Sequence, residues 1–290
     1  MEIQEKSRAH KIVCGRLVLE PGRRTYIMGV LNRTPDSFSD GGEYFDEAVA
    51  LGRAQQMAEE GADIIDIGGE STRPGADPVS VEEELNRVAS VIEKASRIVA
   101  CPISVDTYKH EVAREALRKG ASLINDITGL KGDPLMAGVI AQYGAAVVLM
   151  HIKGTPKDMQ ENPFYEDLIG EIIYSLGESI DIALRAGIDP AKIIIDPGIG
   201  FGKTAPQNLK ILARLGELKA LAKPILIGVS RKSFIGSVLG KAANDRLFGT
   251  SAACAAAIMN GADILRVHDV TEIRDTARVI DAIKRERNVL

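Results

Sequence analysis

Tryptophan is absent from the sequence, and six phenylalanines and six tyrosines bring the aromatic residues to only 4% of 290 residues. Proteins that bind single-stranded nucleic acid stack the bases on aromatic side chains, so this scarcity argues against such a surface. The net charge of −4 and the isoelectric point near 5.7 also argue against binding to nucleic acid or to an anionic membrane. We therefore expect no nucleic acid and no membrane among the partners.

Cysteine is equally scarce. The three cysteines, Cys14, Cys101 and Cys254, are widely spaced and form no Cys-x-x-Cys pair. They predict neither a disulfide framework nor a thiolate zinc site. The charged start of the chain, "MEIQEKSRAHK", does not resemble a signal peptide, and no apolar run approaches membrane length. These absences predict a cytoplasmic protein.

What the sequence does contain is a repeated pattern of short runs rich in Ile, Val and Leu, each ending on a polar residue or glycine. The eight runs cover residues 25–32, 63–70, 102–107, 122–127, 145–151, 192–198, 224–232 and 263–269. Helical periodicity separates them, over 46–60, 80–95, 109–119, 134–143, 164–186, 207–221, 245–260 and 271–286. Ser80 and Glu83 have the spacing of a capping box at the start of one helix.

Nearly continuous apolar strands that alternate with helices indicate a parallel sheet covered on both faces. Eight such units in this length predict an α/β fold, a single-domain (β/α)₈ TIM barrel over residues 25–290, preceded by an N-terminal extension over residues 1–24. A doubly wound open sheet is the alternative.

Polar side chains at the ends of these strands predict a site. The carboxyl ends of barrel strands converge on one face, where the loops build the active site. The residues expected to surround this mouth are Asn32, Asp106, Asn125, His151, Asp196, Lys232, Arg266 and His268. Asp66 and Asp126 can point either way in their strands and are left out of the predicted site.

Several familiar kinds of site are excluded by spacing. In "DPGIGFGKT" (196–204) the Walker pattern requires glycine where Pro197 stands, and the Rossmann spacing requires a third glycine where Lys203 stands. No Gly-x-Ser-x-Gly nucleophile elbow and no His-Glu-x-x-His zinc motif occurs.

Two groups of opposite character remain. Asp106, Asn125 and Asp196 can hydrogen-bond the polar edge of a flat heterocycle, because a carboxylate accepts two parallel N–H bonds from an amino-lactam edge. A cationic group suits an anionic part of the same ligand and comprises Arg73, Arg231, Lys232, Arg266 and His268. Arg266 and His268 lie two apart on one strand, at the corner where this barrel usually binds phosphate.

Seven motifs in order now identify a family. They are "MGVLNRTPDSFSDGG" (28–42), "DIIDIGGESTRPGA" (63–76), "SVDT" (104–107), "INDITG" (124–129), "DPGIGFGK" (196–203), "GVSRKSFIG" (228–236) and "RVHDV" (266–270). With them, residues 24–286 resemble dihydropteroate synthases. These folate-pathway transferases join (7,8-dihydropterin-6-yl)methyl diphosphate to 4-aminobenzoate and release diphosphate and 7,8-dihydropteroate. "MHIKGTP" (150–156) departs from the family pattern with Lys153 where arginine is usual, and we expect little effect.

The resemblance implies a role for each matching residue. Asn32 is expected to ligate Mg²⁺, the implied cofactor, which bridges the diphosphate. The pterin-binding residues are expected to be Asp106, Asn125, Asp196 and Lys232. Thr72, Arg266 and His268 are expected on the diphosphate side, with Arg73 nearby. The 4-aminobenzoate is expected among Phe38, Pro74, Phe201, Lys232 and Ser233, with Ser233 opening a helix.

The resemblance also implies a mechanism and an assembly. Diphosphate leaves first and the arylamine captures the pterin-methylene cation, so the catalytic groups Asp106, Lys232, Arg266 and His268 act electrostatically. Loops 33–42 and 71–78 are expected to close over the substrates. A homodimer is expected, with residues 250–262 and the last helix as candidate contacts.

Two alternatives remain open: a pterin-dependent methyltransferase that acts with a corrinoid protein, and a pterin-binding paralogue without activity. The "SRKS" and "RVHDV" motifs argue against the first, and intact Asn32, Arg73, Lys232, Arg266 and His268 argue against the second.

Overall fold

The computed structural model describes residues 11–15, 17–33 and 47–287 and contains the predicted barrel. Eight parallel strands follow one another in the order β8-β7-β6-β5-β4-β3-β10-β9, and a parallel bridge between Ile195 and Ile225 joins β8 to the β9 end of the sheet. The sheet is therefore closed, and the open-sheet alternative is wrong. The strands are β3 (Tyr26–Asn32), β4 (Ile64–Gly68), β5 (Ile103–Asp106), β6 (Leu123–Asp126), β7 (Ala146–Met150), β8 (Ile193–Asp196), β9 (Leu226–Ile227) and β10 (Ile264–Val267).

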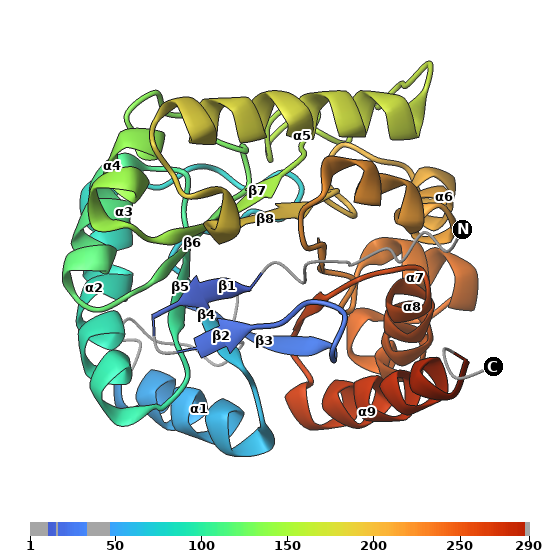
Figure 1. Cartoon of the computed structure of the whole chain (residues 1–290), viewed down its shortest axis with the longest axis horizontal. Coiled ribbons are helices and arrows are strands. Elements are labelled where there is room, and N and C mark those ends of the chain that lie inside the picture. Colours follow the sequence, from blue (N-terminus) through green and yellow to red (C-terminus); the bar gives the residue numbers. More distant parts are fainter. Residues whose placement is uncertain (1–10, 16, 34–46, 288–290) are drawn as a thin grey trace, which may run out of the picture.

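Helices surround the barrel (Figure 1). They are α1 (Glu47–Glu60), α2 (Val81–Ile98), α3 (His110–Arg118), α4 (Met136–Tyr143), α5 (Leu168–Arg185), α6 (Ala205–Ala213), α7 (Ser233–Leu239), α8 (Leu247–Met259) and α9 (Val270–Arg287). The helix predicted over 207–221 is divided, because α6 ends at Ala213 and a 3₁₀ helix, η3, spans Leu215–Leu221. Two shorter 3₁₀ turns are η2 (Pro190–Lys192) and η4 (Ala243–Asp245). The helix expected to open at Ser233 is α7.

The capping box predicted at α2 forms only in part. Ser80 Oγ accepts a hydrogen bond from the Glu83 backbone N–H at 3.1 Å, but the Glu83 carboxylate pairs with Arg87. A complete box forms at α6 instead, where Thr204 and Gln207 exchange side-chain and backbone hydrogen bonds.

Alternation along the strands divides the core into two apolar clusters. Residues such as Ile65, Ile67 and Val105 face the helices, whereas Met28, Ile64, Leu123, Val148 and Ile194 fill the barrel interior. The interior is apolar where the strands begin and polar where they end. The alternation thus decides which side chains reach the mouth.

A hairpin in the N-terminal extension closes the apolar end of the barrel. Strands β1 (Ile12–Cys14) and β2 (Leu17–Leu19) pair antiparallel, and Ile12, Cys14 and Leu19 are fully buried in the interior cluster. Figure 1 shows the hairpin across the centre of the ring of helices.

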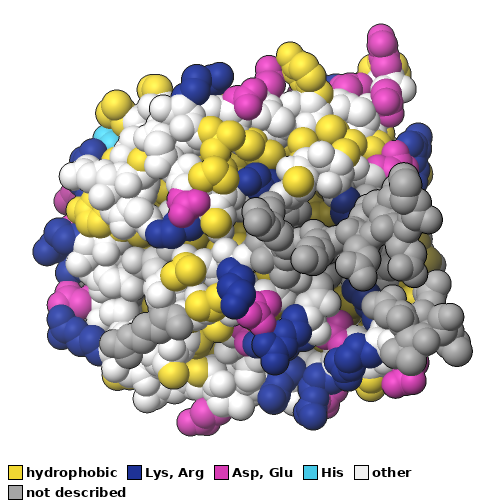
Figure 2. All heavy atoms as spheres, in the orientation of Figure 1, with side chains coloured by type: hydrophobic (Ala, Val, Ile, Leu, Met, Phe, Trp, Pro, Cys, Tyr) yellow, Lys and Arg dark blue, Asp and Glu magenta, His cyan; other side chains and the backbone are white. Residues whose placement is uncertain are grey.

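On the face of the molecule drawn in Figure 2, basic side chains gather toward the lower edge with acidic ones among them. Among the described residues, no helix is long and apolar enough to span a membrane.

Candidate active site

The strand ends bring most of the predicted residues together at the mouth. Asp106, Asn125, Asp196 and Arg266 alternate with helix-facing neighbours, so their side chains point into the barrel. The register pairs Gly68 with Asp106 and Asp106 with Asn125, and it pairs Met150 with Asp196. The acidic and amide groups thus lie on one side of the mouth, and Arg266 reaches them from β10.

Arg266 connects two carboxylates. Its Nε lies 2.6 Å from Asp66 Oδ2, and one terminal nitrogen lies 2.6 Å from Asp106 Oδ2. Burial by itself would lower the pKa of Arg266, but Asp66 and Asp106 hold it above its ordinary value. Burial raises the pKa of Asp106 to about 7 although Arg266 opposes the shift. Arg266 is therefore a permanent cation inside the acidic end of the mouth.

Asp66 belongs to this group and was missed in the sequence. It is 0% exposed, and its Oδ2 also accepts a hydrogen bond from Asn125 Nδ2 at 3.2 Å. It lies between Ile65 and Ile67 in a strand buried on both faces, so only the register shows that it points inward. Asp126 points outward, where its carboxylate accepts hydrogen bonds from the backbone of Thr128 and Leu130.

Asp196 and Lys232 form the second charged group of the mouth. Burial raises the pKa of Asp196, with Lys232 opposing, and burial lowers the pKa of Lys232 to about 8, with Asp196 opposing. The Asp196 carboxylate accepts the Gly198 N–H at 2.7 Å. Lys232 Nζ donates to the Ile199 carbonyl and lies 4.8 Å from the centre of the Phe201 ring. Lys232 is thus close enough to Asp196 and Asp106 to be influenced by their charges, and it lies over the ring of Phe201, the only aromatic residue predicted in the described part of the mouth.

The glycines of "DPGIGFGK" have a packing role. Gly198 has φ of +70°, and a Cβ there would lie 1.9 Å from the His151 carbonyl oxygen. Gly202 has φ of +66°, and its Cβ would lie 2.3 Å from the Lys153 carbonyl oxygen. The loop after β8 is therefore pressed against the chain that follows β7, a contact that only glycine permits at these positions.

His151 does not face the mouth as predicted. Met150 points inward, so the next side chain turns toward the helices, where Nδ1 of His151 lies 2.9 Å from Lys203 Nζ. Lys203, which stands where the Rossmann spacing would require a glycine, is only 2% exposed. Lys153, the residue that departs from the family pattern, bonds Glu171 and the Phe164 carbonyl.

The residues predicted on the diphosphate side are His268 and those of the loop after β4. Burial, together with Arg266 and Arg231, lowers the pKa of His268 to about 4, so its ring is neutral at neutral pH and does not add to the cations. Its Nδ1 lies 3.0 Å from Ser230 Oγ. Arg231 is bound to Asp269. Arg73 is exposed but close enough to lower the pKa of His268 further.

The loop that carries Thr72 and Arg73 is anchored at several points. The Gly75 N–H donates to the Pro156 carbonyl at 3.0 Å, and Val79 N–H donates to Glu70. Glu70 in turn binds Tyr108 and Lys109. Ser233 is exposed at the first position of α7. Phe38 and most of loop 33–42 lie outside the described residues.

Asn32 fits a single-ligand magnesium site. It ends β3 with its side chain toward the mouth, since a Cβ on Gly68 would contact Asn32 Oδ1 at 3.5 Å and Asp106 Oδ2 at 3.8 Å. Among the described residues no hydrogen bond from its amide group is found. An amide oxygen is a suitable hard donor for Mg²⁺, which keeps several waters and substrate oxygens as its other ligands.

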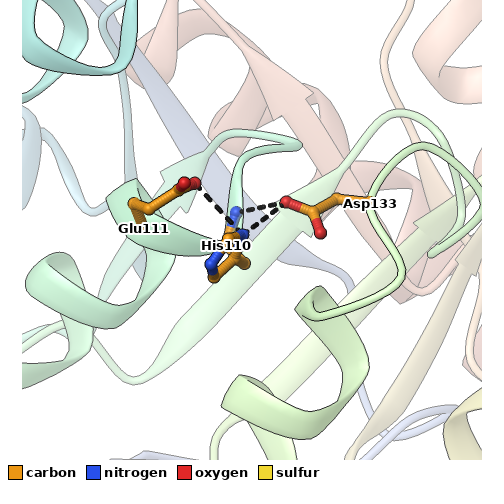
Figure 3. Close-up of side chains that lie close together, drawn as sticks. All are labelled: His110, Glu111 and Asp133. Carbon is orange, nitrogen blue, oxygen red and sulfur yellow. Dashed lines mark hydrogen bonds and ion pairs between the residues drawn. The ribbon is translucent and has the colours of Figure 1, made fainter.

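One cluster of possible metal ligands in the described chain lies away from this mouth. His110 Nδ1 is 2.8 Å from Asp133 and 3.1 Å from Glu111 (Figure 3). Asp133 also accepts the backbone N–H groups of His110 and Leu135 at 2.9 Å, so it caps the start of α3. A helix N-terminus favours anions, and this group is accounted for as a cap.

Comparison with known proteins identifies the family. Residues 28–268 match the pterin binding enzyme family. Dihydropteroate synthase of Synechocystis is 49% identical over 272 residues, which cover 93% of this chain and 94% of the relative. The crystal structure of the Clostridium difficile enzyme with pteroic acid has a TM-score of 0.86 and 49% identity, covering 91% of this chain and 98% of the other. The Xanthomonas albilineans enzyme with 4-aminobenzoic acid has a TM-score of 0.88 and 44% identity, covering 95% and 98%. The chain therefore belongs to the dihydropteroate synthase family of pterin-binding transferases.

Proposed function

We propose that this chain condenses (7,8-dihydropterin-6-yl)methyl diphosphate with 4-aminobenzoate to form 7,8-dihydropteroate and diphosphate. The observation that carries the proposal is the arrangement of the mouth, where buried carboxylates and an amide face one another beside Lys232 and Arg266. This arrangement can bind a polar heterocycle and stabilise an anionic leaving group at the same time. The relatives solved with pteroic acid and with 4-aminobenzoic acid support the two ligand classes.

The pterin edge is assigned to Asp106, Asn125 and Asp196. Both carboxylates are nearly buried, and within the described part of the chain neither accepts enough hydrogen bonds to occupy all its acceptor sites. N–H groups of the heterocycle would supply those donors, and such charge-assisted bonds are both strong and directional. Asp66 supports this edge, because it holds Asn125 and Arg266 from below.

The reaction requires stabilisation of two charges rather than a nucleophilic side chain. When the C–O bond breaks, its electron pair leaves with the diphosphate and a positive charge develops on the pterin-methylene group. Asp106 and Asp196 lie where they favour that positive charge, and Arg266 and the neutral His268 can donate to the departing oxygens. The arylamine nitrogen then forms the C–N bond and loses its proton to water, so no strong general base is needed.

Asn32 would hold Mg²⁺ on the diphosphate side, where the ion supplies positive charge to the phosphate oxygens. Asn32→Ala should therefore weaken binding of the diphosphate substrate mainly when Mg²⁺ is present. Calorimetry with and without Mg²⁺ measures this difference. An equal loss of affinity under both conditions would contradict the assignment of Asn32 as a metal ligand.

The 4-aminobenzoate is assigned to the rim formed by Phe201, Lys232 and Ser233. The half-buried Phe201 ring offers an apolar face, and the Lys232 ammonium and the exposed start of α7 offer donors for a carboxylate. Thr72, Arg73 and Pro74, on the anchored loop after β4, would line the opposite rim.

One assay tests the whole proposal: release of diphosphate from the pterin substrate, measured with and without 4-aminobenzoate. We expect stoichiometric formation of dihydropteroate only when both substrates are present. Pterin binding without diphosphate release would instead indicate an inactive pterin-binding protein. Methyl transfer to a corrinoid protein would indicate the other alternative.

We further propose a homodimer in the cytoplasm. Large apolar side chains are exposed on α7, α8 and α9, namely Val238, Leu239, Phe248, Val279 and Ile283. α8 packs on both α7 and α9, so these residues lie on adjoining helices of one side of the barrel. Exposed apolar surface of this kind favours self-association. All three cysteines are free thiols, which is typical of a reducing compartment.

A further inference from the structure

A buried amine holds together two loops at the mouth. Lys203 Nζ lies 2.8 Å from the Phe201 carbonyl oxygen, 3.3 Å from the His151 carbonyl oxygen and 2.9 Å from His151 Nδ1. Lys203 follows β8 and His151 follows β7, so the contacts join neighbouring loops. A full-length lysine side chain that is 2% exposed is uncommon without a partner carboxylate.

These contacts can be satisfied in either protonation state. As an ammonium, Lys203 donates three hydrogen bonds to three acceptors. As a neutral amine, it donates to the two carbonyl groups and accepts the Nδ1–H of His151. Burial lowers the pKa of both groups, and the imidazole is neutral at neutral pH. The connection therefore persists across the physiological pH range.

The contacts of Lys203 lead to Phe201, a residue assigned above to 4-aminobenzoate binding. The Lys203 amine fixes the main chain at Phe201, and the Phe201 ring lies 4.8 Å from Lys232 Nζ. Other contacts hold the same loop from outside, since Tyr165 Oη donates to the Gly202 carbonyl at 2.8 Å and Gln160 donates to the Gly200 carbonyl at 2.7 Å. Of these three side chains, Lys203 is the one that donates to the carbonyl group of Phe201 itself.

We infer that Lys203, paired with His151, is a positioning residue that fixes Phe201 at the 4-aminobenzoate end of the mouth. The assignment of that end rests on the proposed function. Lys203 does not reach the mouth itself and acts through the Phe201 backbone. Removing one partner of a buried hydrogen bond costs less than the stability of a typical domain. Lys203→Met, which keeps an unbranched side chain, should therefore fold and lose only the amine.

The first measurement reports the position of the loop without any assay of activity. Because the chain has no tryptophan, Phe201→Trp introduces a single tryptophan at the loop, whose emission can be excited selectively. Adding Lys203→Met to this variant should shift the emission to longer wavelength and increase quenching by acrylamide. Lys223→Met is the matched control, since Lys223 donates to the Pro190 carbonyl at 2.7 Å at the opposite end of the barrel. Equal emission and quenching with and without the Lys203 amine would overturn the inference.

The second measurement separates positioning from general stability. In the otherwise native chain, Lys203→Met should raise the KM for 4-aminobenzoate by roughly 10- to 10²-fold, as expected for a displacement of about 1 Å. Affinity for the bare hydroxymethyl-pterin, measured by calorimetry, should change by less than about threefold, because Asp196 and Lys232 remain in place. If the affinity for the pterin fell by the same factor as the KM for 4-aminobenzoate rose, the role of Lys203 would be purely structural and the inference would be overturned.

The His151 side of the pair gives a graded test. His151→Asn keeps a polar group near the position of Nδ1 and should retain most of the native KM. His151→Leu removes that group and should reproduce the Lys203→Met effect, and the double variant should be no worse than either single one. Additive effects of the two substitutions would mean that the residues act separately, against the inference. If the native chain lacked synthase activity, the fluorescence result would still decide whether Lys203 positions the loop.

Discussion

At the scale of single residues, Asp66 and Asp126 show how direction determines role. Both carboxylates are 0% exposed and both lie on strands of the barrel. Asp66 faces the mouth, whereas Asp126 faces a loop outside the barrel. Asp66 binds Arg266 and Asn125. Asp126 binds the backbone of its own loop.

Asp66→Asn should therefore reduce pterin affinity by about tenfold or more, equal to about 1.4 kcal/mol, because the acceptor that Arg266 and Asn125 share loses its negative charge. Asp126→Asn is the matched control and should lower the melting temperature while leaving pterin affinity close to native. Calorimetric titration with hydroxymethyl-pterin and thermal unfolding of both variants make the comparison. Loss of pterin affinity in the Asp126 variant alone would contradict the roles described.

Lys232 leads to a prediction about pH. Burial lowers its pKa to about 8, so its ammonium is present below that pH and is lost above it. If the ammonium binds substrate, pterin affinity should fall as pH rises through about 8, and Lys232→Met should remove this limb of the profile. Titrations between pH 6.5 and 9.5 measure it. A native profile that stays flat would mean that the charge on Lys232 is not used.

Stability should change in the opposite direction with pH. The pKa of Lys232 is lower in the folded chain than the ordinary value of 10.5, so between the two values the unfolded chain binds more protons. The contribution of Lys232 to the free energy of unfolding should then increase as pH rises from about 8 to about 10.5. Comparing urea unfolding of the native chain and Lys232→Met across this window isolates that contribution.

At the scale of elements, the loop after β8 depends on glycine in a way that differs from nucleotide-binding loops. A Cβ on Gly198 would overlap the His151 carbonyl oxygen at 1.9 Å, whereas Gly187 has a similar φ of +89° with nothing within 4 Å of its Cβ. Gly187→Ala should cost only the backbone strain, about 1–3 kcal/mol. Gly198→Ala adds the steric conflict and should destabilise by about 3 kcal/mol or more. Denaturant unfolding tests this difference, and equal losses would count against the packing described.

The strands and helices of the barrel could be predicted because eight apolar runs alternate regularly with segments of helical periodicity. The hairpin formed by β1 and β2 could not, since each strand has only three residues and one residue of each strand is exposed. The division of the helix over 207–221 was also missed, because its apolar periodicity continues through η3 although the backbone tightens after Ala213. Local sequence does not show such a change when the tertiary packing imposes it.

The site was predictable where a strand ends on a polar residue and less so within strands. Asp106, Asn125 and Asp196 follow apolar runs, which indicated the mouth. Asp66 lies within such a run, and a strand buried on both faces has no alternation from which its direction could be inferred. His151 was assigned to the wrong side for the same reason, since its position one residue past Met150 turns it outward.

At the scale of the whole molecule, the proposed dimer can be tested at Phe248, which is 81% exposed on α8. Phe248→Glu should shift the assembly to monomers, because burying an unpaired charge in an apolar contact is unfavourable. Tyr174→Glu is the control, since Tyr174 is 71% exposed on α5, elsewhere on the ring of helices. Light scattering after size-exclusion chromatography measures the mass, and circular dichroism checks the fold. A dimer that survives Phe248→Glu would rule out this side of α8 as the contact.

The hairpin at the base of the barrel also affects the order of events in catalysis. Because Ile12, Cys14 and Leu19 stop the barrel at one end, a molecule that enters by the mouth has to leave by the mouth. In the arrangement proposed above, the heterocycle would lie among the buried Asp106, Asn125 and Asp196, deeper than Phe201 and Ser233 at the rim. A molecule bound at the rim would then obstruct the path of the one below it. The barrel would then have a single opening for both substrates, and the second substrate to bind would cover the first. Substrate binding would therefore be ordered, with the pterin substrate binding before 4-aminobenzoate. The dihydropteroate product would have to leave before another pterin could bind.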